Sequence, residues 1–155
     1  MIQRIQTVYL LLAAVLMAMT CVFPVAWLMQ SDSSFYNINA LGVQAYDMEA
    51  YSLDLGGIAL MVATAIATIV PFAAIFGFNN RCRQMRWVVY AILLMIVQAA
   101  LLAVNIYFLM ESFPTLRLVP NIGAILPLCS IIFSILAHRA IKRDDDKIRS
   151  IDRIR

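Results

Sequence analysis

Four long apolar segments dominate this chain, and they restrict the folds it can adopt more than any other feature. They run over residues 5–29, 54–78, 87–110 and 120–141, and each reaches or exceeds the ~20 residues that cross the hydrocarbon of a bilayer. The apolar residues are continuous, without the alternation of a half-buried soluble element. Only 14% of residues are charged, against about 25% in a soluble domain. The pattern predicts an all-α integral membrane protein, a single domain with four transmembrane helices.

The first apolar segment has two rival interpretations. Arg4 before an apolar run imitates a secretory signal peptide, but the run exceeds an h-region of about 7–15 residues and no A-x-A-like site closes it. Lipidation at Cys21 is disfavoured too, because Thr20 is a poor residue immediately before a lipidated cysteine. We therefore expect residues 5–29 to remain as an uncleaved membrane anchor.

Basic residues are segregated among the loops that join the segments. Eleven of the 12 lysines and arginines are Arg4, the three arginines of residues 81–86 and the seven basic residues of the C-terminal end, 138–155, whereas Arg117 alone falls in the opposite set of loops. Cytoplasmic loops carry the excess of Lys and Arg, so both termini and the middle loop are predicted to face the cytoplasm. Trp87 and Tyr90 follow the middle loop, as interface aromatics commonly do. An even number of spans agrees with this orientation.

The longest polar stretch between apolar segments is residues 30–53, which hold three acidic residues and no basic one. Residues 31–34 have the composition of a turn, and residues 35–41 alternate loosely before Gly42, as a short strand does. We expect a short β-hairpin in a small extracytoplasmic loop between the first two spans.

Two amides interrupt the third apolar segment. Gln98 lies near its centre, and Asn105, seven residues on, lies on nearly the same helix face. Amides in hydrocarbon seek partners, and an interhelical hydrogen bond contributes about 0.6 kcal/mol on average. By depth the candidate partners are Thr64 and Thr68 in the second segment and Ser130 in the fourth. Two interpretations stay open: a polar contact inside the bundle, or a face that lines a cavity or a subunit interface.

The central parts of the segments hold no ionisable residue, although proton and ion relays normally use one at that depth. This disfavours a proton-coupled transporter. His138 is alone at the inner boundary, and Cys21, Cys82 and Cys129 fall on different segments without ligand spacing. No nucleophile motif or phosphate-binding glycine pattern is present. We therefore predict no metal, no cofactor and no enzymatic activity, and the segregated charge gives no support for nucleic-acid binding.

The charged tail, residues 142–155, also carries a narrow apolar stripe. Acidic residues three and four positions before Arg149 favour a helix. Ile141, Ile148 and Ile151 share one face of that helix. Three interpretations remain: a solvated helix end, a helix lying on anionic headgroups, or a docking site for a protein partner. The candidate docking residues are Ile141, Ile148, Ile151 and Arg149.

Several motifs give the chain a family resemblance. They are residues 1–7 (MIQRIQT), Asn80-Arg81 with Gln84 and Arg86, Leu126-Pro127-Leu128, and the ending from Ala137 to Arg155. Together they resemble a family of small inner-membrane proteins of Bacteroidota that is catalogued only as a domain of unknown function, and the likeness covers essentially the whole chain. The resemblance implies four helices and a small extracytoplasmic loop region in the bacterial inner membrane. It implies no activity, cofactor or catalytic residue.

Three functions follow as hypotheses. The first is a non-catalytic accessory or assembly subunit of a larger inner-membrane complex, whose partners are the lipid bilayer and other membrane-protein subunits. The second is an oligomeric channel or small-solute transporter with Gln98 and Asn105 facing a pore. The third, a membrane enzyme acting on lipid, needs a polar cleft with a nucleophile or metal ligands, which the sequence does not display. We favour the first, because an elaborate charged tail accompanies a chain without buried charge or catalytic residues.

Overall fold

The computed structural model describes residues 5–29, 35–45, 51–52, 55–77, 80–112 and 117–152 of the chain. Within these residues the chain forms four α-helices: α1 Ile5–Met19, α2 Leu55–Phe76, α3 Arg81–Ser112 and α4 Ile125–Asp152. The same residues form the strands β1 Ala26–Met29, β2 Phe35–Asn39, β3 Gly42–Ala45, β4 Tyr51–Ser52 and β5 Arg117–Pro120, and the 3₁₀ helix η2 Ile122–Ala124.

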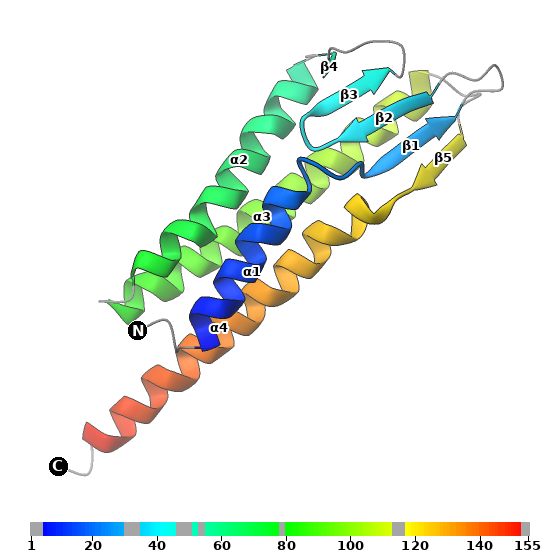
Figure 1. Ribbon diagram of the computed structural model, residues 1–155. Coiled ribbons are helices and arrows are strands. Elements are labelled where there is room, and N and C mark those ends of the chain that lie inside the picture. The colour runs from blue at the N-terminus through cyan, green and yellow to red at the C-terminus, as the bar shows by residue number, and fades with distance from the viewer. Residues whose placement is uncertain are drawn as a thin grey trace.

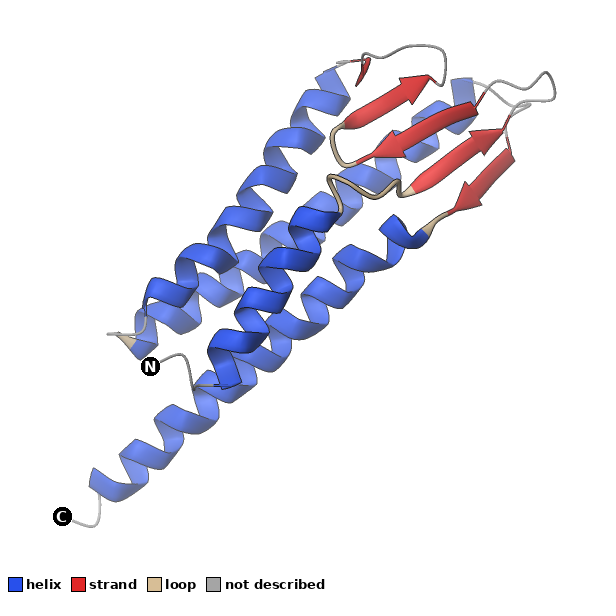
Figure 2. Cartoon of the chain, in the orientation of Figure 1, coloured by secondary structure: helices blue, strands red, loops and turns tan. Residues whose placement is uncertain are grey.

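The helices form an elongated bundle that carries a β-sheet at one end (Figure 1, Figure 2). α1 packs beside α2 and α4, and α3 packs beside the same two helices, so α1 and α3 are diagonal to each other. We call the end with the strands the sheet end. At the opposite end, the tail end, α4 projects past the other helices. α1 and α3 run from the tail end to the sheet end, and α2 and α4 run back.

Three of the described helices are apolar and long enough to cross a membrane, over Gly57–Phe76, Arg81–Glu111 and Ile122–Asp146. The protein is therefore compatible with a multi-pass membrane location. α1 is apolar as well but has 15 residues, which at 1.5 Å each rise about 22 Å. The prediction of an uninterrupted first span over residues 5–29 is wrong, because the chain leaves the helix after Met19 and continues as β1.

The end of α1 has a local cause. The Thr20 amide donates to the Met17 carbonyl at 3.2 Å, and the Thr20 hydroxyl donates to the same oxygen at 2.6 Å. Pro24 follows, and a proline both lacks an amide hydrogen and disfavours helical backbone at the residue before it. Hydropathy alone cannot separate a short buried strand from a continuing helix, so the boundary is marked by Pro24 and not by a change in polarity.

The helices also extend beyond two of the predicted spans. α3 begins at Arg81 and not near Trp87, and the carbonyl of Asn80 accepts a hydrogen bond from the Gln84 amide at 2.9 Å, as the carbonyl of an N-cap residue does. α4 continues past residue 141 to Asp152. In both places the helix continues through charged residues. Hydropathy marks only the apolar part of a helix, so it does not reveal where these helices end.

The described strands form one antiparallel five-stranded sheet in the order β4-β3-β2-β1-β5. The predicted hairpin is its β2–β3 pair, in which Asn39 opposes Gly42 across a turn at Ala40 and Leu41. Gly42 has a φ of 134°, which a glycine adopts without strain. The sheet is larger than predicted because β1 comes from the first apolar segment and β5 from the connection before α4. Residues 31–34, predicted as a turn, lie outside the described residues.

One face of the sheet packs on the bundle. Ala26, Leu28 and Ile38 are buried, and Ile106 and Leu109 of α3 pack against them. Trp27, between the two buried residues of β1, is exposed, as the alternation of side chains along a strand requires. The sheet is therefore part of the hydrophobic core at the sheet end.

Backbone contacts join β1 to the start of α4. The Asn121 amide donates to the Val25 carbonyl at 3.0 Å, and the Gly123 amide donates to the Pro24 carbonyl at 3.1 Å. The Asn121 side chain accepts a hydrogen bond from the Ile122 amide at 2.7 Å, as the N-cap of η2. Gly123 is buried against the backbone of Phe23 and Pro24. These contacts fix where the chain enters the sheet relative to the last helix.

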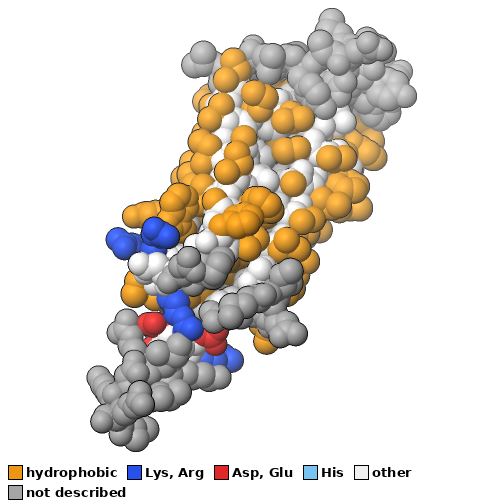
Figure 3. Space-filling view, turned by 60° about the vertical axis from the view of Figure 1, so that its left-hand side comes forward, with side chains coloured by type: hydrophobic (Ala, Val, Ile, Leu, Met, Phe, Trp, Pro, Cys, Tyr) orange, Lys and Arg blue, Asp and Glu red, His pale blue; other side chains and the backbone are white. Residues whose placement is uncertain are grey.

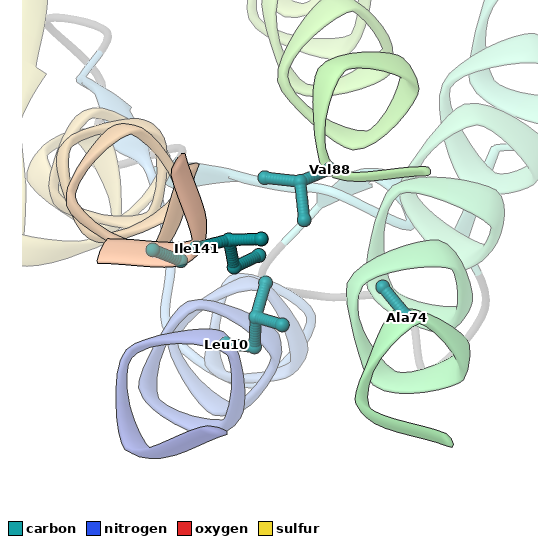
Figure 4. Close-up of a cluster of buried hydrophobic side chains, with 5 residues drawn as sticks. Leu10, Ala74, Val88 and Ile141 are labelled. Atoms are coloured by element: carbon teal, nitrogen blue, oxygen red, sulfur yellow. The ribbon is translucent and has the colours of Figure 1, made fainter. Parts of the chain in front are cut away.

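All four helices contribute to a buried apolar cluster near the tail end, made of Leu10, Ala74, Val88, Ala137 and Ile141. Figure 4 shows Leu10, Val88 and Ile141 pointing toward one another from three helices. Ile141 has no exposed surface. The prediction that Ile141 belongs to an exposed docking stripe is wrong, because its side chain fills the interior of the bundle.

The face of the bundle that Figure 3 shows is apolar over most of its length. Large exposed side chains include Ile69, Phe76 and Phe108. On α3 the exposed aromatic residues Trp87 and Tyr107 lie twenty residues apart, a rise of about 30 Å. This spacing matches the thickness of bilayer hydrocarbon, at whose two edges aromatic residues collect.

Candidate functional site

Gln98 and Thr64 lie against each other in the interior of the bundle. Nε2 of Gln98 on α3 donates to Oγ1 of Thr64 on α2 at 3.4 Å, and neither side chain has exposed surface. The Thr64 hydroxyl donates in turn to the Leu60 carbonyl at 2.8 Å. Oε1 of Gln98 is buried and has no hydrogen-bond partner among the described residues. Gln98 thus joins two helices through one hydrogen bond that is longer, and so weaker, than the usual range.

Asn105 and Thr68, the other amide and the other predicted threonine, bond within their own helices. Nδ2 of Asn105 donates to the Leu101 carbonyl at 2.8 Å. Oγ1 of Thr68 donates to the Thr64 carbonyl at 2.8 Å. Small polar side chains in helices often donate a hydrogen bond to the backbone carbonyl four residues earlier. The structure therefore brings neither residue into a hydrogen bond with Gln98.

Ser130 on α4 bonds to α1 instead of to Gln98. Its hydroxyl donates to the Ala13 carbonyl at 2.8 Å, and the sulfur of Met95 lies 3.5 Å away. Ser134, one turn along α4, donates to the same sulfur at 3.5 Å. A hydroxyl has one hydrogen to donate, so the shorter Ser130–Ala13 contact is its hydrogen bond. Sequence reasoning missed Ser134, although its spacing of four residues from Ser130 places both on one helix face.

Two buried amides at the tail end were also missed by the sequence interpretation. Gln84 is buried in the first turn of α3, and its Nε2 donates to the Ala74 carbonyl of α2 at 3.1 Å. Gln6 is buried in α1. Oε1 of each amide has no hydrogen-bond partner in the described part of the chain. A signal exists for Gln84: it precedes Gln98 by two heptads, and so lies on nearly the same face of α3.

Replacing Gln98 with leucine is expected to change the free energy of unfolding by less than about 1 kcal/mol. The change removes one long hydrogen bond, but it also removes a buried oxygen without a partner and leaves Thr64 bonded to Leu60. Unfolding by dodecyl sulfate in mixed micelles measures the difference. A loss several times larger would mean that Gln98 has a partner besides Thr64.

Beyond Ile141, α4 projects from the bundle as a helical arm, residues 142–152 (Figure 1). Nη1 of Arg81, at the start of α3, donates to the Asp144 carbonyl at 3.0 Å. This contact ties the first turn of the arm to the bundle. Of the predicted docking residues Ile148, Arg149 and Ile151, the structure describes the helical backbone and not the side chains.

The described residues hold no group of three or more His, Cys, Asp or Glu side chains that could bind a metal ion. Cys82 is exposed, Cys21 and Cys129 are half-buried, and all three thiols are free. His138 on α4 lies beside a groove that is otherwise lined by α3. The interior polar groups described above make hydrogen bonds within and between helices, and the arm and this groove are two features at the tail end that could bind another molecule.

The chain belongs to the family described as a domain of unknown function (DUF4293), which matches residues 2–154. No curated protein and no solved structure matches it. The predicted membership of a family catalogued as a domain of unknown function is confirmed. The family description assigns no activity.

Proposed function

We propose that the protein is a non-catalytic accessory or assembly subunit of a larger inner-membrane complex, held by its helix bundle and bound to a partner through the arm. The observation that carries the proposal is the course of α4, which continues to Asp152. Ile141 is its last buried residue among the side chains that the structure describes, which extend to Asp146. The arm continues a helix that is already formed, but most helical stability in proteins comes from tertiary packing of one helix face. A partner surface would supply the packing that the bundle does not.

The composition of the arm suits a protein partner better than a lipid surface. Three consecutive acidic residues, 144–146, come directly before Lys147, and Arg149 follows two residues later. Ile148 and Ile151 lie on one face of the helix. A helix that lies on anionic headgroups carries a basic polar face. Mixed charge flanking a short apolar strip instead favours complementary contacts with one particular surface.

The proposal also places the tail end in the cytoplasm. Basic residues collect at that end in the first turns of α3 and the later turns of α4, whereas Arg117 lies on β5 at the sheet end. Cytoplasmic segments near membrane spans carry the excess of Lys and Arg. With both the start of α1 and the arm at the tail end, the termini would be cytoplasmic and the sheet extracytoplasmic.

Truncation after Asp146 tests the role of the arm. This variant keeps Ile141 in the core and the Asp144 carbonyl that Arg81 binds, so the bundle should insert and fold normally. We expect the full-length protein to co-purify with a membrane partner in mild detergent, and the truncated protein to retain on the order of tenfold less of it, since a few contact residues carry most binding energy.

Truncation after Asp152 is the matched control, because it removes residues 153–155 and keeps the whole described helix. It should retain the partner. The full-length double variant Ile148→Ser, Ile151→Ser should behave like the truncation after Asp146. A full-length protein that purifies alone, or a truncated protein that keeps its partner, contradicts the proposal.

The alternative of an oligomeric channel receives less support from the same geometry. Gln98 is buried against Thr64, and Asn105 bonds to its own helix. The channel hypothesis requires both of these amides to face a pore. We therefore keep the accessory role as the proposal.

A further inference from the structure

An open groove of about 550 Å³ lies between α3 and α4 near the tail end. Its lining residues are Cys82, Met85, Arg86, Val89 and Tyr90 of α3 and His138 of α4. Apolar side chains therefore line the groove together with a guanidinium, a phenol and an imidazole. Such a combination suits an amphipathic ligand.

The imidazole of His138 lines the groove from α4. Its Nδ1 is buried and has no hydrogen-bond partner among the residues described, so contact with the groove belongs to the rest of the ring. Arg86 lines the same groove from the facing helix and is exposed. Guanidinium and imidazole N–H groups are strong partners for a phosphate oxygen.

The groove lies where the basic tail end meets the apolar surface of the bundle, a boundary that Figure 3 shows on one face of the molecule. Trp87 and Tyr90 are exposed there, as aromatic residues at a membrane interface are. One turn farther toward the sheet end, Leu93 of α3 and Ile135 of α4 are exposed and in line with the groove by helical period. The groove, with its polar side chains, is therefore continuous with an exposed apolar surface at Leu93 and Ile135.

We propose that this groove binds one anionic phospholipid, with its phosphate on Arg86 and His138 and an acyl chain along Leu93 and Ile135. Charge complementarity identifies the occupant, because basic pockets between membrane-spanning helices near the cytoplasmic surface bind acidic headgroups. The apolar lining distinguishes it from a site for a free anion. The inference concerns a different surface from the arm; it rests on the proposed cytoplasmic placement of the tail end and not on the accessory role.

Native mass spectrometry of the full-length protein tests the site, with dioleoylphosphatidylglycerol, dioleoylphosphatidylcholine and inorganic phosphate as probes. We expect one phosphatidylglycerol to be retained, phosphatidylcholine to bind at least about fivefold more weakly, and inorganic phosphate not to be retained. Arg86→Ala should weaken phosphatidylglycerol binding about fivefold, the effect of one basic residue near an anionic surface. Because Arg86 is exposed, this variant should fold like the parent protein.

Arg83→Ala is the matched control, since Arg83 is also exposed near the start of α3 but lines a separate groove with Ala73 and Trp87. It should leave the affinity unchanged. His138→Leu should weaken binding, and His138→Gln, which keeps a side-chain N–H, should recover part of the loss. Equal losses in the Arg83 and Arg86 variants would reduce the effect to general charge attraction and overturn the proposal. Equal affinity for the two lipids, or retention of inorganic phosphate, would overturn it as well.

Discussion

Gly123→Ala is expected to lower the free energy of unfolding by about 3 kcal/mol, at the upper end of the usual range for overpacking. A Cβ at this position would lie 2.4 Å from the Pro24 carbonyl oxygen and 2.7 Å from that of Phe23. Backbone atoms cannot turn aside as a flexible side chain can. Relief of the collision would move η2 away from β1 and break the hydrogen bond from Gly123 to Pro24.

Unfolding by dodecyl sulfate in mixed micelles, followed by tryptophan fluorescence, measures this loss. Gly77→Ala serves as the control, because the added Cβ would lie 3.8 Å from Cβ of Gln84, an ordinary contact. We expect this second variant to stay within about 0.5 kcal/mol of the parent. Equal stability of the two variants would contradict the close approach of η2 to the entry of β1.

Ile141→Ala is the other substitution with a large expected effect, a loss of about 2–4 kcal/mol. Ile141 is fully buried among Leu10, Val88 and Ala137, so the shorter side chain leaves a cavity where three helices meet. Association of helices inside a membrane depends on close packing rather than on removal of apolar surface from water. A cavity at the tail end should therefore loosen the bundle at the base of the arm.

Ile132→Ala is the matched comparison, since Ile132 lies on the same helix and is 56% exposed. Its truncation should change the unfolding free energy by less than about 0.5 kcal/mol. Both variants are measured in the same micelles, with partner co-purification as a second readout. If Ile141→Ala left stability unchanged and removed the partner, Ile141 would belong to the docking surface after all.

The helical part of the fold could be predicted from the apolar segments, because continuous hydropathy over membrane length has few other solutions. The error in the first segment shows the limit of that argument. Residues 26–29 are as apolar as the helix before them, yet they pair with β2 and β5. A buried strand and a helix have the same hydropathy, and Pro24 carried the signal that was missed.

The sheet could be predicted only at its β2–β3 hairpin, where the turn before Gly42 is local in sequence. The β1–β5 pair joins residues 26–29 to residues 117–120. These segments are far apart in the sequence, so no short-range pattern indicates that they pair. Two-residue turns constrain neighbouring strands, whereas distant strands meet because the helices between them bring their ends together. The sheet is therefore a consequence of the bundle as much as of its own sequence.

The candidate site, too, could be predicted from the sequence only in part. Gln98 and Thr64 could be matched by depth, because the axial rise of a helix is regular. The burial of Ile141 could not be predicted, since a stripe of isoleucines has the same sequence pattern whether it faces the core or solvent. The structure separates the two cases at the residue where α4 leaves the bundle: Ile141 is in the core, and the arm begins after it.

A photo-crosslink from the arm in living cells is the most direct test of the docking role. A photoreactive amino acid in place of Ile148 is predicted to form an adduct with one discrete membrane protein. The same amino acid in place of Ile132, on the exposed apolar surface of the bundle, is predicted to give lipid adducts instead. Lipid adducts alone, or no adduct, from position 148 would contradict the account.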